Sequence, residues 1–312
     1  MPLRTGRVRV PGRAVAVVVT HERLDLLRAS LAAVLAQTRR PDAVVVVDNA
    51  STDGTAEAVR TQHPDVDLVV LPSNTGGAGG FALGIQRALE AHDADLLWLL
   101  DDDTVPCPDA LARLLDAWSA RPDEPPALVA SRVVWTDGRD HPMNTPRPAP
   151  LARAGERAAA QAVSCVPVRS ASFVSVLLDA RAVRAVGLPV ADYFLWNDDF
   201  EFTTRLLRDR AGLLCPDSVV EHRTRRFGDS EADPGPRFYY EVRNKVWLFT
   251  RSPGLRPLER GLYAASTAAR WGRTFRVSRD RATLRRAALR GLRDGVRTRP
   301  RPNAEVLAGG PR

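Results

Sequence analysis

The chain has 312 residues, of which 44% are hydrophobic and 26% are charged, and this composition excludes a wholly disordered or fibrous protein. Its 45 basic and 37 acidic residues give a net charge of +8, and the excess lies in residues 251–312, which contain 16 arginines and 4 acidic residues. Cys107, Cys165 and Cys215 form no Cys-x-x-Cys pair, which argues against a zinc site or a disulfide framework and fits a reducing compartment. No apolar run is long enough to span a bilayer, so we expect a cytoplasmic protein.

The first 120 residues alternate between short apolar runs and segments with helical spacing of their apolar residues. The predicted strands are Ala14–Val19, Ala43–Val47, Val66–Leu71 and Leu96–Leu100. The predicted helices are Leu24–Gln37, Thr55–Thr61, Gly79–His92 and Pro108–Ser119. This alternation predicts an α/β fold with a mostly parallel sheet covered by helices on both faces.

The rest of the chain is less regular. We predict strands at Ala127–Trp135 and Phe173–Leu178, a loop at Thr136–Pro150, a helix from its cap at Asp179 to Gly187, and a helix at Asp199–Arg210. Two arginine-rich helices are predicted at Pro257–Phe275 and Asp280–Val296.

Polar clusters follow each of the first four predicted strands. They are Thr20–Arg23, Asp48–Gly54, Ser73–Gly80 and Asp101–Asp103. Ligands of parallel α/β sheets bind outside the carboxyl ends of the strands, so we expect these clusters to form one site. Three adjacent carboxylates repel one another unless a cation lies among them, and their oxygens suit Mg²⁺ or Mn²⁺. The alternative is a solvated acidic turn that caps the next helix.

Three further features are candidates for the same site. Asp48 can accept from a ribose hydroxyl or a base N–H, or it is a turn residue. The glycine run Gly76–Gly80 allows a ligand to approach the backbone, or it is a flexible loop. Asp198 and Asp199 start a helix beside aromatic residues, which suits a general base in a pocket as well as helix capping.

These motifs together resemble a family 2 glycosyltransferase with a GT-A fold, over residues 13–250. The resemblance rests on the Thr20-His21-Glu22 opening, the VVDNASTDG block at 46–54, the NTGGAGG loop at 74–80, the Asp101–Asp103 block and the acid pair at 198–199. The stretches at 74–84 and 194–201 and the tract 238–249 most resemble bacterial galactofuranosyltransferases that start cell-wall galactan.

The resemblance implies roles for individual residues. Residues expected to bind the nucleotide sugar are Thr20, Arg23, Asp48, Asn49, Asn74, Gly76, Gly77, Asp101 and Asp102. The expected ligands of Mn²⁺ or Mg²⁺ are Asp103, His222 and Asp101. Asp199 matches the general base, with Asp198 as the other candidate, and Trp196 and Glu201 are expected to contact the acceptor.

The activity that the resemblance implies is a single inverting displacement. The donor is a UDP-sugar, with UDP-galactofuranose preferred over a rhamnose donor, and the acceptor is a glycan linked to a polyprenyl diphosphate. The alternative of a sugar nucleotidyltransferase requires a glycine-rich basic loop after the first strand, where Thr20–Arg23 stands. A non-catalytic protein that binds nucleic acid through the basic tail lacks the expected aromatic residues and motif.

We therefore expect two parts. Residues 1–250 form the catalytic domain, with a nucleotide-sugar half at 13–125 and an acceptor half at 126–250, and residues 251–312 form a basic helical segment with a disordered end. The basic helices either pack on the domain or lie on an anionic membrane, because their apolar residues are interleaved with arginines. The second interpretation predicts a peripheral protein on the inner face of the cell membrane, with no nucleic-acid partner.

Overall fold

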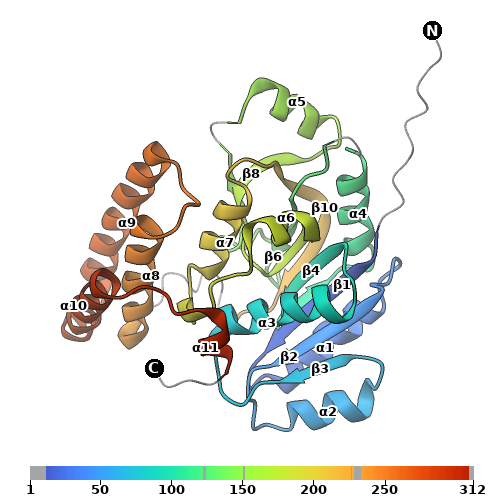
Figure 1. The fold of residues 1–312 in the computed structure, drawn as a ribbon, viewed down its shortest axis with the longest axis horizontal. Helices are drawn as coiled ribbons and strands as arrows, with labels where there is room; N and C mark the ends of the chain where they lie inside the picture. Colours follow the sequence, from blue (N-terminus) through green and yellow to red (C-terminus); the bar gives the residue numbers. More distant parts are fainter. Residues whose placement is uncertain (1–11, 122–123, 150–151, 226, 228–232, 309–312) are drawn as a thin grey trace.

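The computed structural model describes residues 12–121, 124–149, 152–225, 227 and 233–308. In this part of the chain one mixed sheet runs through the centre, in the strand order β3-β2-β1-β4-β9-β6-β10-β8-β7, with β5 paired to β10 (Figure 1). The strands are β1 (Ala14–Thr20), β2 (Ala43–Asp48), β3 (Asp67–Val70), β4 (Leu96–Asp101), β5 (Thr104–Pro106), β6 (Leu128–Val134), β7 (Arg147–Pro148), β8 (Val166–Ser170), β9 (Ser175–Asp179) and β10 (Gly212–His222).

Helices cover both faces of this sheet. They are α1 (Leu24–Leu35), α2 (Thr55–Gln62), α3 (Gly76–Ala91), α4 (Ala110–Ser119), α5 (Ala154–Gln161), α6 (Ala180–Val186), α7 (Asp198–Leu206), α8 (Phe238–Thr250), α9 (Pro257–Val277), α10 (Arg281–Arg297) and α11 (Asn303–Leu307). Alternate residues of β1 point to opposite faces, as the pleat of a strand requires. Ala16 and Val18 pack with α1 and α4, whereas Val17 and Val19 pack with α3 and α7.

The predicted alternation of the first 120 residues is confirmed, because each predicted strand and helix is present within a few residues of its expected bounds. The parallel ladder β3-β2-β1-β4 results from this alternation. The antiparallel strand β9 then lies between β4 and β6, so the sheet is mostly but not wholly parallel. The predicted helix at Asp199–Arg210 begins one residue earlier and ends at Leu206.

The structure contains elements that the sequence patterns did not predict. These are β5 in the first half of the chain and β7, β8, β10, α5, α8 and α11 in the second. The most consequential is β10, which pairs with β6, β8 and β5 and carries His222 at its end. The β5 pairing aligns His222 with Thr104 and so joins two distant parts of the sequence.

The arginine-rich segment is helical, as predicted, and α10 packs along α8 (Figure 1). The expected boundary at residue 250 coincides with the end of α8. The chain then returns to the catalytic body, where Asn303 accepts a hydrogen bond from the backbone of Ala191 at 2.9 Å. Residues 303–307 form α11, and residues 309–312, where the predicted disordered end would fall, lie outside the described part. Among the described helices, none combines the length and the apolar character that crossing a bilayer requires.

Candidate active site

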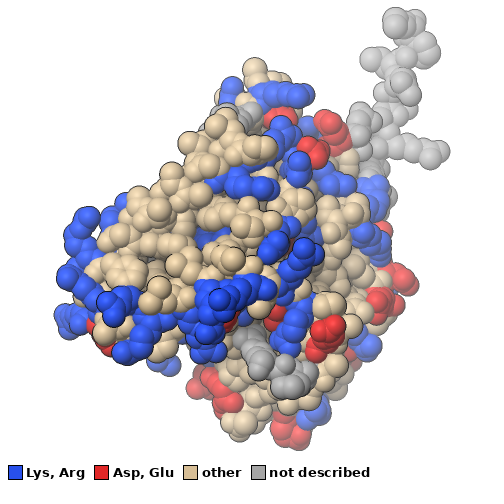
Figure 2. All heavy atoms as spheres, turned by 60° about the vertical axis from the view of Figure 1, so that its left-hand side comes forward, with Lys and Arg blue, Asp and Glu red and all other residues tan. Residues whose placement is uncertain are grey.

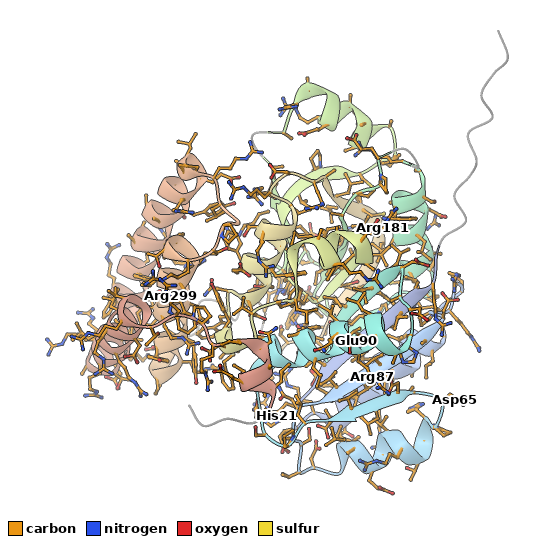
Figure 3. The ribbon with its side chains drawn as sticks, viewed as in Figure 1. His21, Asp65, Arg87, Glu90, Arg181 and Arg299 are labelled. Carbon is orange, nitrogen blue, oxygen red and sulfur yellow. The ribbon has the colours of Figure 1, made fainter. Side chains whose placement is uncertain are left out.

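The carboxyl ends of β1, β2 and β4 meet at one edge of the sheet. Thr20 lies opposite Asp48 in the β1–β2 ladder, and Val19 lies opposite Asp101 in the β1–β4 ladder. The polar clusters that follow these strands therefore share one edge, as the sequence predicted. His21, labelled in Figure 3, lies at this edge below α11 in that view.

Asp102 connects the loop after β1 to the acidic triplet through hydrogen bonds. Its carboxylate accepts hydrogen bonds from the Thr20 hydroxyl at 2.9 Å and from the His21 backbone N–H at 3.3 Å. Arg23 bridges Asp102 and Asp103 at 3.2 and 2.7 Å. The Thr20 hydroxyl and the Asp102 carboxylate thus hydrogen-bond to each other, which favours a structural role for both. About half of the Arg23 side chain is exposed.

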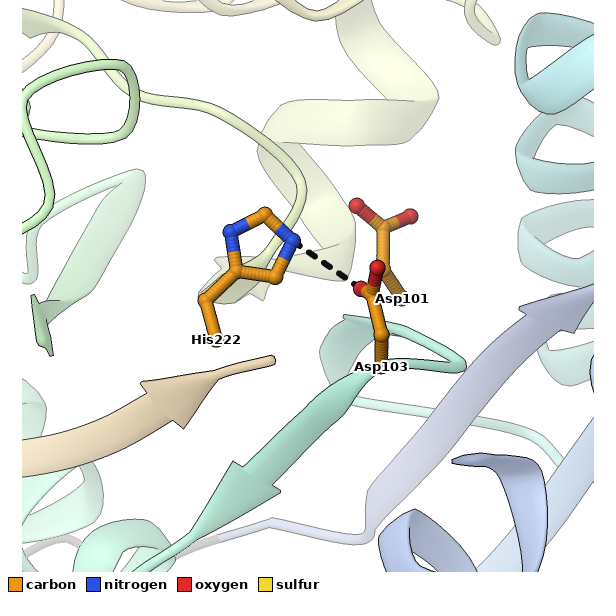
Figure 4. A group of neighbouring side chains, drawn as sticks. All are labelled: Asp101, Asp103 and His222. Atoms are coloured by element: carbon orange, nitrogen blue, oxygen red, sulfur yellow. Dashed lines mark ion pairs between the residues drawn. The ribbon is translucent and has the colours of Figure 1, made fainter. Parts of the chain in front are cut away.

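Asp101, Asp103 and His222 converge at the end of β4 (Figure 4). One potential ligand atom from each lies within 4.8 Å of the others, and His222 Nε2 is 2.9 Å from Asp103 Oδ1. Because β5 runs back along β10, the turn that contains Asp103 lies directly beside the end of β10. This pairing explains how residues more than 100 positions apart form one cluster.

The cluster fits a divalent cation. Asp103 Oδ1 is buried and lies 2.9 Å from His222 Nε2, so the two atoms form an ion pair when the imidazole is protonated and can both bind a cation when it is neutral. His222 Nδ1 lies 2.9 Å from the Asn144 side-chain oxygen, which only accepts, so Nδ1 carries a proton and Nε2 faces the carboxylates. Burial and the neighbouring Asp103 raise the pKa of Asp101 to about 7, which shows how much uncompensated negative charge gathers there. Two carboxylates and an imidazole suit Mn²⁺ or Mg²⁺.

Asp48 and Asn49 differ in whether they have a polar atom without a hydrogen-bond partner in the structure. Asp48 is fully buried, and its Oδ1 accepts a hydrogen bond from the Ser51 N–H at 3.0 Å, whereas its Oδ2 has no partner. A buried carboxylate oxygen without a partner is costly, so it is well suited to a ligand donor. The Asn49 amide instead donates to the Gly76 carbonyl at 2.8 Å and accepts from the Thr75 N–H, which gives it a structural role.

The glycine run is the first turn of α3 and not a loop. A Cβ at Gly76 would lie 1.9 Å from the Phe194 carbonyl oxygen, and a Cβ at Gly80 would lie 2.4 Å from Val19. The glycines therefore allow close packing of the protein on itself. Gly77 is the exception, with open space around it, and the neighbouring Asn74 side chain is exposed apart from its bond to the Gly76 N–H.

The acid pair starts α7 immediately after a turn with unusual backbone geometry. Phe194, Trp196 and Asn197 all have positive φ values of 64–66°. Such conformations cost free energy in residues other than glycine and occur often at functional sites. The turn brings Asp198 near the acidic triplet, because Asp198 interacts electrostatically with Asp101.

Burial raises the pKa of both acids, and their neighbours differ. Asp198 is buried, and the charges of Asp199 and Asp101 raise its pKa further. Asp199 accepts a hydrogen bond from the Phe200 N–H at 2.6 Å, and the cations Lys245 and Arg147 lower its pKa. The nearby charges of the two acids therefore differ. Asp198 has the negative charge of Asp101 near it, and Asp199 has the positive charges of Lys245 and Arg147.

The two residues expected to contact the acceptor have different surroundings. Trp196 is half-buried, with the Arg237 guanidinium 5.4 Å from its ring. Glu201 is buried, pairs with Arg205 at 2.9 Å and accepts from the Ser252 hydroxyl at 2.8 Å. This pairing favours a structural role for Glu201 over the predicted acceptor contact.

Sequence analysis missed the support that α8 gives to this site. Asn244 donates to three backbone carbonyls of the turn before Asp198, and Arg243 donates to two. Lys245 lies beside Phe200 on α7. The tract 238–249 was noted for its resemblance alone. A polar triplet inside an otherwise apolar helix was the signal that these side chains have buried partners.

A known family model matches about half of this chain, and known proteins resemble it over most of its length. The family model described as "Glycosyl transferase family 2" matches residues 15–167. Galactofuranosyltransferase GlfT1 of Mycolicibacterium smegmatis is 31% identical over 303 residues, which are 91% of this chain and 94% of that protein. GlfT1 of Mycobacterium tuberculosis is 33% identical over 85% of this chain and 89% of its own.

Solved structures show the same fold at lower identity. TarS residues 1–349 from S. aureus superimpose with a TM-score of 0.60 and 16% identity over 91% of this chain and 81% of that one. The present chain spans 44% of the longer TarS structure. GalNAc-T7 with UDP, GalNAc and Mn²⁺ gives a TM-score of 0.57 and 15% identity over 84% of this chain and 56% of that one.

Proposed function

The chain belongs to glycosyl transferase family 2, and we propose that it is an inverting enzyme that transfers galactofuranose from UDP-galactofuranose to a lipid-linked glycan. The observation that carries the chemistry is the convergence of Asp101, Asp103 and His222 with the acid pair Asp198–Asp199 at one sheet edge. The sugar rests on the similarity to the two GlfT1 proteins, which extends through both halves of the chain.

Each part of the site has a role in this reaction. The buried Asp48 oxygen without a partner accepts from the uridine, and the open space at Gly77 admits the donor. Asp103, His222 and Asp101 would hold a Mn²⁺ or Mg²⁺ ion, whose positive charge would offset the charge of the leaving diphosphate. Trp196 provides an apolar face for the acceptor sugar.

The displacement takes place in one step. Asp199 removes the proton from an acceptor hydroxyl, and that oxygen forms a bond to the anomeric carbon from the face opposite the nucleotide. The bond between the anomeric carbon and the diphosphate oxygen breaks, and UDP leaves. The configuration at the anomeric carbon inverts, and the proton stays on Asp199 until it passes to solvent.

A donor screen tests this proposal. Release of the nucleoside diphosphate, UDP or dTDP, is measured from UDP-galactofuranose, UDP-galactose, UDP-glucose, UDP-N-acetylglucosamine and dTDP-rhamnose, with a polyprenyl-diphosphate glycan as acceptor and with Mn²⁺ or EDTA. We expect turnover of UDP-galactofuranose with Mn²⁺ and none with EDTA. Asp199→Asn should lower kcat by roughly 10²–10⁴, the range for loss of a general base, and leave donor binding intact. Turnover of dTDP-rhamnose alone would refute the donor assignment.

We also propose that α9 and α10 attach the enzyme to the anionic cytoplasmic face of a membrane, where such an acceptor resides. Exposed apolar side chains on these helices support this: Leu258, Leu262, Val277, Leu289, Leu292 and Val296 are between 41% and 71% exposed. Figure 2 shows basic side chains at the margin of this side of the molecule, around a broad area without charge. Apolar groups bordered by arginines suit the headgroup region of an anionic bilayer.

Vesicle sedimentation tests the attachment. The protein should sediment with anionic vesicles at low salt and be released at high salt, because each arginine contributes about 1 kcal/mol that salt screens. The double substitution Leu258→Asp and Leu262→Asp should reduce binding, whereas Val70→Asp, an exposed apolar residue on β3, should not. Equal binding by both variants would refute the assignment to α9.

A further inference from the structure

The turn before the acid pair has a further connection to the rest of the protein, through the side chain of Asn197. This residue directly precedes α7, and its backbone is left-handed, with φ 66° and ψ 0°. An asparagine at this position usually caps the first turn of the helix with its side chain, but the Asn197 side chain makes no such bond. Its amide instead donates to Glu241 Oε2 on α8 at 2.7 Å. The Asn197 side chain therefore attaches the turn to another helix.

The other oxygen of Glu241 is bonded to α9. Oε1 accepts from the Arg270 guanidinium at 2.6 Å and from the Trp271 indole N–H at 3.1 Å. Only 15% of the Glu241 side chain is exposed, so water has little access to the group that the turn and α9 share. Burial raises the pKa of Glu241, but the charges of Lys245 and Arg270 and these hydrogen bonds hold it below its ordinary value, so the group is an ionised acceptor.

The two donors on α9 are themselves held in place. Trp271 packs edge-on against the Phe238 ring of α8, with the ring centres 6.0 Å apart. At the start of α9, Glu259 pairs with Arg169 of β8 at 2.6 Å, which joins the helix to the central sheet. Groups held on a packed helix define a position more closely than groups on a loop. The contacts of Glu241 therefore connect the turn to an anchored element.

We propose that Glu241 is a positioning residue whose carboxylate, bonded to Asn197 on one side and to α9 on the other, makes the orientation of the acid pair depend on the packing of α9. The inference rests on the proposed function, in which Asp199 accepts the proton of the acceptor hydroxyl. A side chain with two acceptor oxygens is needed here, because N–H donors approach it from both sides. The helix α9 is then part of the catalytic unit as well as a surface for attachment.

Hydrogen exchange measured by mass spectrometry tests the connection without substrate. In Arg270→Met the peptide that contains residues 193–198 should exchange about tenfold faster, because Glu241 loses a charged partner that holds it in place. The peptide that contains β2 reports global stability and should not change. Arg273→Met removes an exposed arginine of the same helix and is the matched control, with wild-type exchange in both peptides. Unchanged exchange of residues 193–198 in Arg270→Met would overturn the proposal.

A second variant protects this test against misfolding. Trp271→Phe keeps an aromatic ring against Phe238 and loses only the indole donor to Glu241. It should raise the exchange of residues 193–198 by about threefold. If the β2 peptide of Arg270→Met also exchanges faster, the result for Trp271→Phe decides, and unchanged exchange there would overturn the proposal.

A double-mutant cycle tests whether the effect on turnover passes through the turn. Arg270→Met should lower kcat by about tenfold and leave the donor KM within about twofold of wild type, because the acid pair moves and the nucleotide-sugar half does not. Asn197→Ala breaks the bond between the turn and Glu241. In that background Arg270→Met should change kcat by less than about twofold. Tenfold losses in both backgrounds would show that the two side chains act independently and would overturn the proposal.

Failure of this inference and failure of the proposed function are distinguishable. If wild-type protein transfers no sugar, the proposed function fails, and hydrogen exchange still reports whether α9 holds the turn. If transfer occurs and Arg270→Met keeps the wild-type kcat while residues 193–198 exchange faster, the proposed function stands and the positioning role of Glu241 is overturned. Thermal unfolding of each variant identifies any loss of activity that comes from misfolding.

Discussion

Asn244→Ala should weaken both the fold and the reaction, because one side chain supports the turn before the acid pair. The Asn244 amide donates to the carbonyls of Tyr193, Leu195 and Trp196 at 2.9, 2.9 and 2.8 Å. It is fully buried, so water cannot replace it without rearrangement. The same turn contains three non-glycine residues with positive φ, whose conformation depends on such bonds.

The expected losses of stability and of kcat in Asn244→Ala follow from these contacts. An amide has two N–H groups, so three acceptors share two donors, and the third contact is bifurcated. Loss of two buried hydrogen bonds at about 1 kcal/mol each, with a carbonyl left unpaired, destabilises the protein by about 2–3 kcal/mol. For a chain of this size such a change lowers Tm by about 3–5 °C. A turn that relaxes by even 1 Å should lower kcat by about 10²-fold.

The assay combines thermal unfolding with steady-state kinetics. Asn244→Asp keeps the volume but turns a buried carboxylate oxygen toward the three carbonyl oxygens, so it should destabilise the protein at least as much as Asn244→Ala. Gln86→Ala removes an amide that bonds only to Glu90 on the surface, and it should leave Tm and kcat unchanged. A lowered Tm with wild-type kcat would refute the argument that this turn positions the base. An unchanged Tm would refute the argument that the hydrogen bonds of the Asn244 amide stabilise the fold.

Two further predictions concern the metal and the C-terminal helices. Mn²⁺ affinity measured by calorimetry should fall as the pH drops below about 7, where Asp101 takes up the proton that the ion must displace; a flat profile between pH 5.5 and 7.5 would exclude Asp101 as a ligand. Arg169→Met should destabilise the protein by about 3–5 kcal/mol in urea unfolding, because it leaves the Glu259 carboxylate unpaired at the base of α9. A loss below 1 kcal/mol would show that α9 is anchored by other contacts.

The first half of the fold was predictable because each local sequence pattern there is compatible with one type of secondary structure. Ala14–Val19 is apolar at every position, which a strand covered on both faces satisfies. Once parallel strands alternate with helices, their carboxyl ends meet at one edge, and the polar residues there are brought together. Asp48, Asp101 and Asp103 follow from this rule without any tertiary information.

The rest of the site depends on pairings between distant segments. His222 reaches Asp103 because β10 pairs with β5, and that pairing joins positions 104 and 222. No local sequence pattern predicts the pairing of β5 with β10, because β5 has only three residues and β10 contains a bulge between Cys215 and Val219. Asn144 was part of a predicted loop and is nonetheless the hydrogen-bond partner of the metal-site histidine.

The C-terminal helices show why an amphipathic pattern does not identify what covers its apolar face. Trp271, Phe275 and Leu284 were predicted as part of a membrane-facing surface, but they pack against Phe238 of α8. Other apolar residues of the same two helices remain exposed. The packing interpretation of the tail therefore holds for the inner stripe of each helix, and membrane attachment through the outer stripe, which has no protein partner in the described chain, stays a prediction. An anchored pair of helices suits membrane attachment better than a free tail, since it fixes the orientation of the active site above the lipid surface.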